Sequence, residues 1–160
     1  MPIPAFDDNG NLPPGRHVAT VQEVREALVA AFPTSTTRGA IFRYWHDHRR
    51  ALEEIVEVHC QWLAGSFASD KEDPADADVV TVLDGPAFDA LPRHQRILVQ
   101  SLIAGHYTED FWNCDAYPVL AYPEDHHGHQ HFRIAVERWE DYFGHDRDGN
   151  ACGFVEVDES

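Results

Sequence analysis

The chain has 160 residues, of which 43% are hydrophobic, so it can form one compact domain with its own core. No apolar stretch approaches the roughly 18 residues that a membrane span requires, and the N-terminus lacks a basic region followed by an apolar one, so we expect a cytoplasmic protein without a signal peptide. Its 28 acidic residues against 12 Lys and Arg give a formal net charge of −16, which argues against tight unaided binding to a long nucleic acid because phosphate backbones would be repelled.

The N-terminal part of the chain predicts an extended segment, two helices and a strand. Residues 1–17 are rich in Pro, Gly, Asn and Asp and predict an extended lead-in. Apolar residues at helical spacing predict one helix near 20–32 and a second from about 35 to 55. Alternating apolar residues then predict the first strand, over 56–62.

The remaining elements alternate between strands and helices. The β-branched run VVTVL at 79–83 suits a central strand, and residues 86–105 predict a helix. A third strand is expected over 113–121, where Pro118 indicates an edge or a bulge. A last helix near 130–143 has a continuous apolar stripe, and the tail GNACGFVEVDE predicts a short strand after a turn.

This order predicts an α/β or α+β fold: a small mixed sheet flanked by helices, with two N-terminal helices preceding the first strand. We expect residues 18–160 to form a single domain. The three cysteines, Cys60, Cys114 and Cys152, are widely spaced and fit no zinc-site pattern, so we interpret them as small buried side chains of a cytosolic protein.

The stretch GSFASDKEDPADAD, at 65–78, carries the chemistry. Asp76 and Asp78 are two residues apart, so on a strand they would share one face. Two carboxylates so placed raise each other's pKa unless a hard divalent cation neutralises them. The Gly65-Ser66 turn, with its backbone N–H groups and the Ser66 hydroxyl, can meet an anion. Together these features predict a metal-bound phosphate site.

This pattern resembles the polymerase-β-like nucleotidyltransferase superfamily. Its signature is a Gly-Ser or Gly-Gly turn after a first strand, Asp-x-Asp on a second strand, and a third acid on a later strand. Here these are Gly65-Ser66, Asp76 and Asp78 within DADVV, and Asp115 within NCDAYPV. The residue pattern looks closest to a small bacterial and phage branch related to the minimal nucleotidyltransferases. The motifs LPPG near the start and GxVEV near the end also fit that branch.

The resemblance implies a nucleotidyltransferase-like fold and Mg²⁺- or Mn²⁺-dependent transfer of a nucleoside monophosphate from an NTP to a hydroxyl of a protein, an RNA or a small molecule. Asp76 and Asp78 would hold the metal on the triphosphate, and Asp115 would help hold a second ion and orient or deprotonate the hydroxyl. Ser66 would contact a terminal phosphate beside Gly65. Lys71 would supply positive charge in a loop where the minimal enzymes carry Arg-Gly.

A second function stays open at this point: the same fold without catalysis, serving as an antitoxin-like or phage- or defence-associated binding protein. The acidic surface and the atypical loop around Lys71 favour it, and they predict a basic protein partner. The acidic charge also admits a small anionic substrate if metal ions bring it in.

Histidines offer a further set of interpretations. EDHHGHQH, at 124–131, could bind a transition metal, or one histidine could reach the nucleotide or acceptor, but we favour an exposed polar loop. Its histidines are His126, His127, His129 and His131. His48 lies on the apolar stripe of its helix and is expected to be a hydrogen-bonded core residue. DRDGN, at 146–150, predicts a turn and not a calcium loop.

Overall fold

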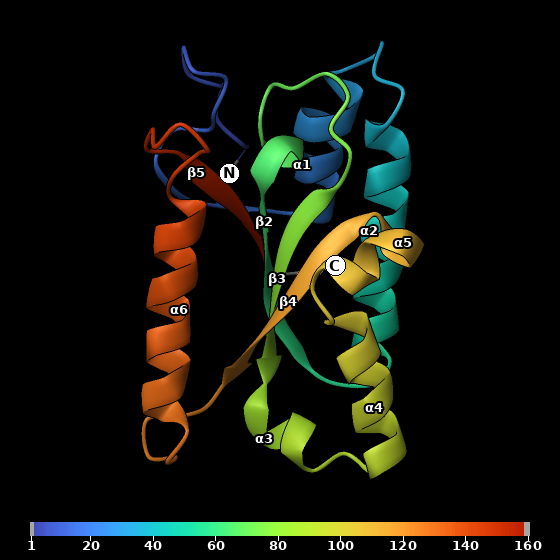
Figure 1. Cartoon of the computed structure of the whole chain (residues 1–160), viewed down its shortest axis with the longest axis vertical. Coiled ribbons are helices and arrows are strands. Elements are labelled where there is room, and N and C mark those ends of the chain that lie inside the picture. The colour runs from blue at the N-terminus through green and yellow to red at the C-terminus, as the bar shows by residue number, and fades with distance from the viewer. Residues whose placement is uncertain (1, 159–160) are drawn as a thin grey trace.

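The computed structural model describes residues 2–158, which form a five-stranded mixed sheet with helices on both faces (Figure 1). The α/β fold class predicted from the sequence is confirmed. The strands are β1 (Gly15–Ala19), β2 (Val58–Ala64), β3 (Ala77–Asp84), β4 (Cys114–Ala121) and β5 (Gly153–Val157). Within this part of the chain, every helix is too short or too polar to cross a membrane.

The helices differ widely in length. The long ones are α2 (Arg38–Glu53), α4 (Arg93–Leu102) and α6 (His129–Phe143). The short ones are α1 (Val21–Arg25), which continues as the π-helix η1 (Glu26–Ala30), the 3₁₀ turns η2 (Gly65–Ala68) and η3 (His106–Thr108), α3 (Gly85–Asp89) and α5 (Glu109–Trp112). Thr20 caps α1 through a capping box with Glu23, which fixes where the first helix begins.

The strand order is β1-β5-β2-β3-β4. β2 lies antiparallel to both β3 and β5, whereas β1 pairs with β5 and β3 with β4 in parallel. Because β3 and β4 run in the same direction, the residues where they begin lie side by side at one end of the sheet. Asp78 is the register partner of Asp115, and Ala64, the last residue of β2, is the register partner of Asp78 on its other side.

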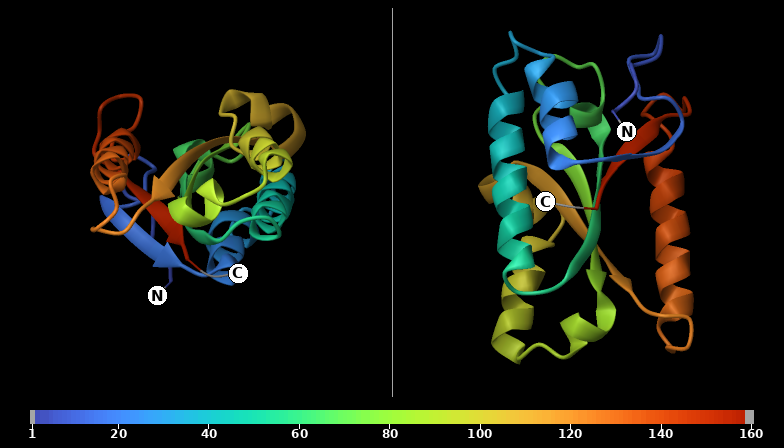
Figure 2. Two further views of the ribbon diagram at one scale, coloured as in Figure 1. Left: turned by 90° about the horizontal axis from the view of Figure 1, so that it is seen from below. Right: turned by 180° about the vertical axis from the view of Figure 1, so that it is seen from behind.

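The two faces of the sheet are covered unequally. Helices α1, α2 and α4 lie on one face and α6 on the other (Figure 2). Successive strand residues point to opposite faces, so Leu63 and Val79 pack into the core under α2, while Trp62 and Val80 pack into the cluster under α6. A single helix cannot cover a five-stranded sheet, and this leaves open space on the α6 face.

His48 confirms its predicted role in the core. Its side chain is fully buried, and its Nε2 lies 2.5 Å from the carbonyl oxygen of Leu102. Burial lowers the pKa of His48, so the neutral ring is favoured. The ring also makes an edge contact with Trp112, which joins α2 to α5. Pro118 lies on an edge strand, β4, in agreement with the edge or bulge that this proline predicts.

The prediction of two helices before the first strand is wrong. β1 spans Gly15–Ala19, so a strand precedes both helices and takes up the end of the predicted lead-in. Its partner is β5, almost at the other end of the chain, and most of its residues are exposed. Because few of its side chains are buried, the β1 segment lacks the alternation of apolar residues that would predict a strand. The lead-in also contributes a core residue, Leu12, which is fully buried.

The predicted helix at 86–105 is in fact two helices, α3 and α4, separated at Pro92. Proline cannot continue a helix, and Pro92 instead caps α4 in an extended conformation. The two short elements that follow, η3 and α5, were not predicted, because each is too short to show a helical period.

Candidate metal and phosphate site

Four carboxylates meet where β3 and β4 begin. Carboxylate oxygens of Asp76, Glu109 and Asp115 lie within 4.8 Å of one another, and Asp78 stands beside Asp115 in the sheet register. The structure thus brings together the three predicted acids and adds Glu109. Asp78 is within β3, whereas Asp76 immediately precedes it. Oxygen donors in this number suit a hard divalent cation such as Mg²⁺ or Mn²⁺.

The Gly65-Ser66 turn contacts this cluster directly. Gly65 has a φ of 72°, a left-handed conformation that favours glycine. A Cβ atom at this position would overlap Oδ2 of Asp78, so only glycine allows the turn to approach the carboxylate. Ser66 follows at the start of η2 and is half-buried. The predicted turn and the predicted acids therefore form one continuous surface.

The acids raise one another's pKa. Burial, followed by the charges of Asp76 and Asp115, raises the pKa of Asp78 to about 6. Burial and Asp76 also raise the pKa of Asp115, and the charge of Asp76 raises that of Glu109. Oδ1 of Asp115 is buried and has no hydrogen-bond partner within the described part of the chain. The cluster therefore holds more negative charge than its neighbours neutralise, and a cation would relieve it.

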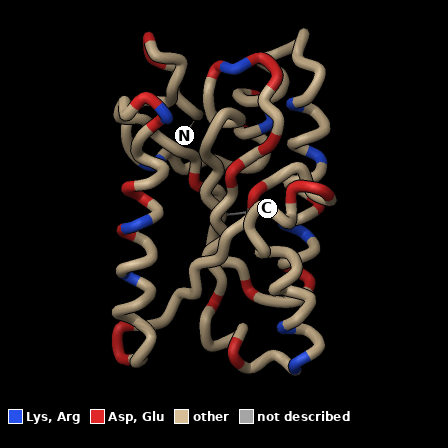
Figure 3. Tube along the Cα trace, in the orientation of Figure 1, with Lys and Arg blue, Asp and Glu red and all other residues tan. Residues whose placement is uncertain are grey.

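Two basic side chains lie close enough to the acids to act on their pKa values. Arg147, in the turn before β5, opposes the rise in the pKa of Asp78, and His106 opposes that of Asp115. Lys71 is exposed on the loop, and its backbone carbonyl is turned toward Arg38. Figure 3 shows how acidic residues dominate the loop before β3 and the neighbouring segment around α5.

Arg38, at the start of α2, holds the loop that carries the Gly-Ser turn. It is fully buried, and burial lowers its pKa to about 10, which leaves it charged. It donates hydrogen bonds of 2.6–3.4 Å to the backbone carbonyls of Leu28, Ser66, Phe67, Ser69 and Lys71. Its guanidinium also lies 3.8 Å from the ring centroid of Phe32. Charge-assisted bonds to successive carbonyls fix the course of this loop.

Thr108 explains how Glu109 reaches the site. Its buried hydroxyl donates to the carbonyl of Cys114, 2.7 Å away, and accepts from the N–H of Ala116 at 3.0 Å. These two residues flank Asp115, so the turn η3 is attached to β4 beside that aspartate. Glu109 comes next in the chain. The local run TED, a hydroxyl before two acids at the start of a helix, is the signal in the sequence that could have pointed to it.

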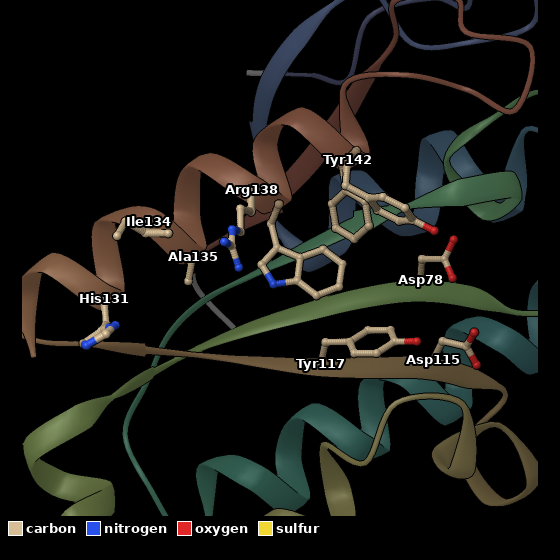
Figure 4. A pocket seen from close by; sticks show the side chains of 10 residues that line it. Asp78, Asp115, Tyr117, His131, Ile134, Ala135, Arg138 and Tyr142 are labelled. Carbon is tan, nitrogen blue, oxygen red and sulfur yellow. The ribbon is translucent and has the colours of Figure 1, made fainter.

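A cavity of about 660 Å³ opens beside the acids, between α6 and the sheet. Asp78 and Asp115 lie at one end of it, and Tyr117, two residues after Asp115 on the same face of β4, lines its floor (Figure 4). The residues that α6 contributes are His131, Ile134, Ala135, Arg138, Trp139, Tyr142 and Phe143. In Figure 4 the hydroxyl of Tyr142 points toward Asp78.

The histidines of the 124–131 loop do not converge on a common point. His126 stacks on Tyr122 and His127, and Nδ1 of His129 lies 2.8 Å from the carbonyl oxygen of Tyr122. In residues 2–158, sets of three or more potential ligand atoms gather only at Asp76 with Glu109 and Asp115, and at an exposed group. That second group consists of Glu57, His59 and Asp84. Asp84 already serves as the N-cap of α3, through a 2.8 Å bond from the Ala87 N–H.

Comparison with known proteins places almost the whole chain in one family. Residues 4–158 match a family of unknown function, DUF6932. The chain belongs to the DUF6932 family. No curated protein and no solved structure matches it.

Proposed function

We propose that this DUF6932 protein is a metal-dependent nucleotidyltransferase, which moves a nucleoside monophosphate from an NTP to a hydroxyl. The observation that carries the proposal is the convergence of Asp76, Asp78 and Asp115 at the point where the Gly65 turn touches Asp78. The resemblance of the sequence to the nucleotidyltransferase superfamily, whose signature joins such a turn to three acids, supports the same assignment. The convergence also brings a place for phosphate and a place for cations onto one surface.

The residues divide the chemistry between them. Mg²⁺ or Mn²⁺, held by the carboxylates, would supply the positive charge that binds and activates the triphosphate. The N–H groups of the Gly65-Ser66 turn and the Ser66 hydroxyl meet its terminal phosphates. Asp115, whose pKa is raised, orients the acceptor hydroxyl and takes its proton as the new oxygen–phosphorus bond forms and the bond to pyrophosphate breaks.

The test uses purified protein, each of the four NTPs labelled at the α-phosphate, Mg²⁺ and a cell lysate as the source of acceptor. We expect label to pass to a protein, an RNA or a small molecule. The double change Asp76→Asn and Asp78→Asn should abolish it, because the metal loses two ligands. Asp47→Asn, an exposed position on α2, is the matched control. Transfer that survives the double change would refute the proposal.

A second candidate is a binding protein with the same site but no catalysis. The observation that favours it is the exposed Lys71, which stands where the minimal enzymes carry Arg-Gly. Calorimetry with ATP and Mg²⁺ separates the two. Absence of nucleotide binding at about 1 mM, an interaction weaker than about 4 kcal/mol, would favour the binding protein. A complex with a basic protein that persists in chelator would then be expected.

A further inference from the structure

The cavity under α6 is apolar along most of its length. The rings of Tyr117 and Trp139 lie 5.0 Å apart, and Trp139 in turn meets Tyr142 at 5.7 Å. Ile134 and Tyr142 are 40% and 69% exposed although both line the cavity. Large apolar side chains that line a hollow and stay exposed offer a surface that a small ligand can cover.

The two ends of the cavity differ in charge. Asp78 and Asp115 occupy one end, and Arg138 from α6 enters further along, away from the two acids (Figure 4). His131 continues the lining beyond Arg138. The chain has a formal net charge of −16 and few basic side chains, and one of these, Arg138, is directed into an apolar cavity. This arginine fits an anionic group on the ligand.

The position of the cavity relative to the strands indicates which substrate it takes; this step rests on the proposed function. Across the sheet, the order is Ala64 and the Gly65 turn on β2, then Asp78 on β3, then Asp115 on β4. The triphosphate belongs at the β2 side, where the turn lies. Along the strands, the turn follows Ala64 at the end of the sheet, whereas Tyr117 lies two residues further into β4 than Asp115. The cavity therefore extends from the acids away from the turn, on the side left for the acceptor hydroxyl.

We propose that the cavity binds the acceptor, and that the acceptor is a small hydroxyaryl acid. Its ring packs against Trp139 and Tyr117, its hydroxyl reaches Asp78 and Asp115, and its carboxylate or phosphate pairs with Arg138. The size agrees, since about 660 Å³ lies within the range of small-molecule sites. Arg138 and Tyr142 are one helical turn apart, about 6 Å along α6, which matches one ring with a short side chain.

The test measures binding without catalysis, with para-hydroxyphenylpropionate as the probe and its uncharged amide as the comparison. We expect backbone NMR signals of α6 and of Tyr117 to shift on titration at about 1 mM probe, and the amide to bind at least about tenfold more weakly. Arg138→Gln should weaken the acid to the level of the amide. Arg133→Gln, on the same helix but outside the cavity lining, should leave the affinity unchanged.

Three results would overturn the proposal: no shifts on α6, equal binding of acid and amide, or displacement of the probe by a non-hydrolysable ATP analogue with Mg²⁺. The last result would assign the cavity to the nucleobase. Asp76→Asn separates this proposal from the proposed function, because Asp76 does not line the cavity. That variant should lose metal binding and keep the probe. Probe binding without any transfer of label would leave the cavity as a binding site for hydroxyaryl acids and would reject the transferase.

Discussion

The two faces of the sheet treat buried polar groups in opposite ways. Under α2, Gln61 accepts from the indole of Trp45 at 2.9 Å and donates to the hydroxyl of Thr81 at 2.8 Å, and Arg49 pairs with Glu53. On the α6 side, Asp78 and Asp115 share their end of the sheet with two further acids, and their pKa values are raised. These polar groups on the first face find partners within the chain, whereas the carboxylates on the second repel one another.

The paired polar groups stabilise the fold, whereas the clustered carboxylates destabilise it. Burial of a paired polar group costs little, but burial of like charges side by side destabilises the folded state. Groups with strongly perturbed pKa values gather more often at functional sites than elsewhere. The α2 face therefore supplies stability, and the α6 face carries the proposed site. Substitutions on the two faces should change stability in opposite directions.

The largest effect is expected at Arg38. Arg38→Met should lower the free energy of unfolding by about 3–5 kcal/mol, because buried carbonyls of the 66–71 loop would lose their donor. Urea denaturation measures it. Arg43→Met, at an exposed position on the same helix, should change stability by less than about 0.5 kcal/mol. A loss at Arg38 as small as that of the control would contradict the role assigned to this side chain.

The opposite sign is expected at Asp78. Its folded-state pKa of about 6 exceeds the ordinary 3.8, so ionising it in the folded protein costs about 3 kcal/mol. Near neutral pH, Asp78→Asn should therefore stabilise the protein by about 2–3 kcal/mol. Well below pH 3.8 the carboxyl is protonated in both states and the gain should vanish; it should grow as pH rises from about 3.8 to about 6 and level off above that. Denaturation curves across this range, with Asp47→Asn as the control, test the sign.

Gly65 tests whether the turn and the acid are in contact. Gly65→Ala should destabilise the protein by about 1–2 kcal/mol more than Gly149→Ala. Both glycines have positive φ, 72° and 81°, so backbone strain is matched. Only at Gly65 would the new Cβ overlap Asp78, since the space around Gly149 is open. Thermal unfolding of the two variants gives the comparison, and equal losses would mean that the turn does not press on the carboxylate.

The smallest effect is expected at Arg147. Because its charge opposes the rise in the pKa of Asp78, Arg147→Gln should move that pKa further upward. Arg147 is exposed, so the change should correspond to less than about 1 kcal/mol. NMR titration of the Asp78 carboxyl carbon measures it. Arg133→Gln, on the surface of α6, should leave the titration unchanged. A lower pKa of Asp78 in the Arg147 variant would exclude the charge interaction assigned to Arg147.

The sequence could predict those parts of the fold and site whose signals are local. The VVTVL run, the stripe of α6 and the buried His48 all follow from periodicity within one element. The pair Asp76 and Asp78 could be recognised because the two acids are neighbours in the chain. β1 and Glu109 could not be predicted, since each depends on a partner far away in sequence or on a turn too short to show a period.

The chain by itself determined the fold class, the long helices, and the association of a Gly-Ser turn with acids at the start of a buried strand. Local patterns suffice for these because they depend on spacing alone. Only the tertiary structure decided that Asp115 lies in register with Asp78, that Arg38 orders the 66–71 loop, and that α6 leaves a cavity beside the acids. Those relations join residues from different elements, and packing alone sets their distances.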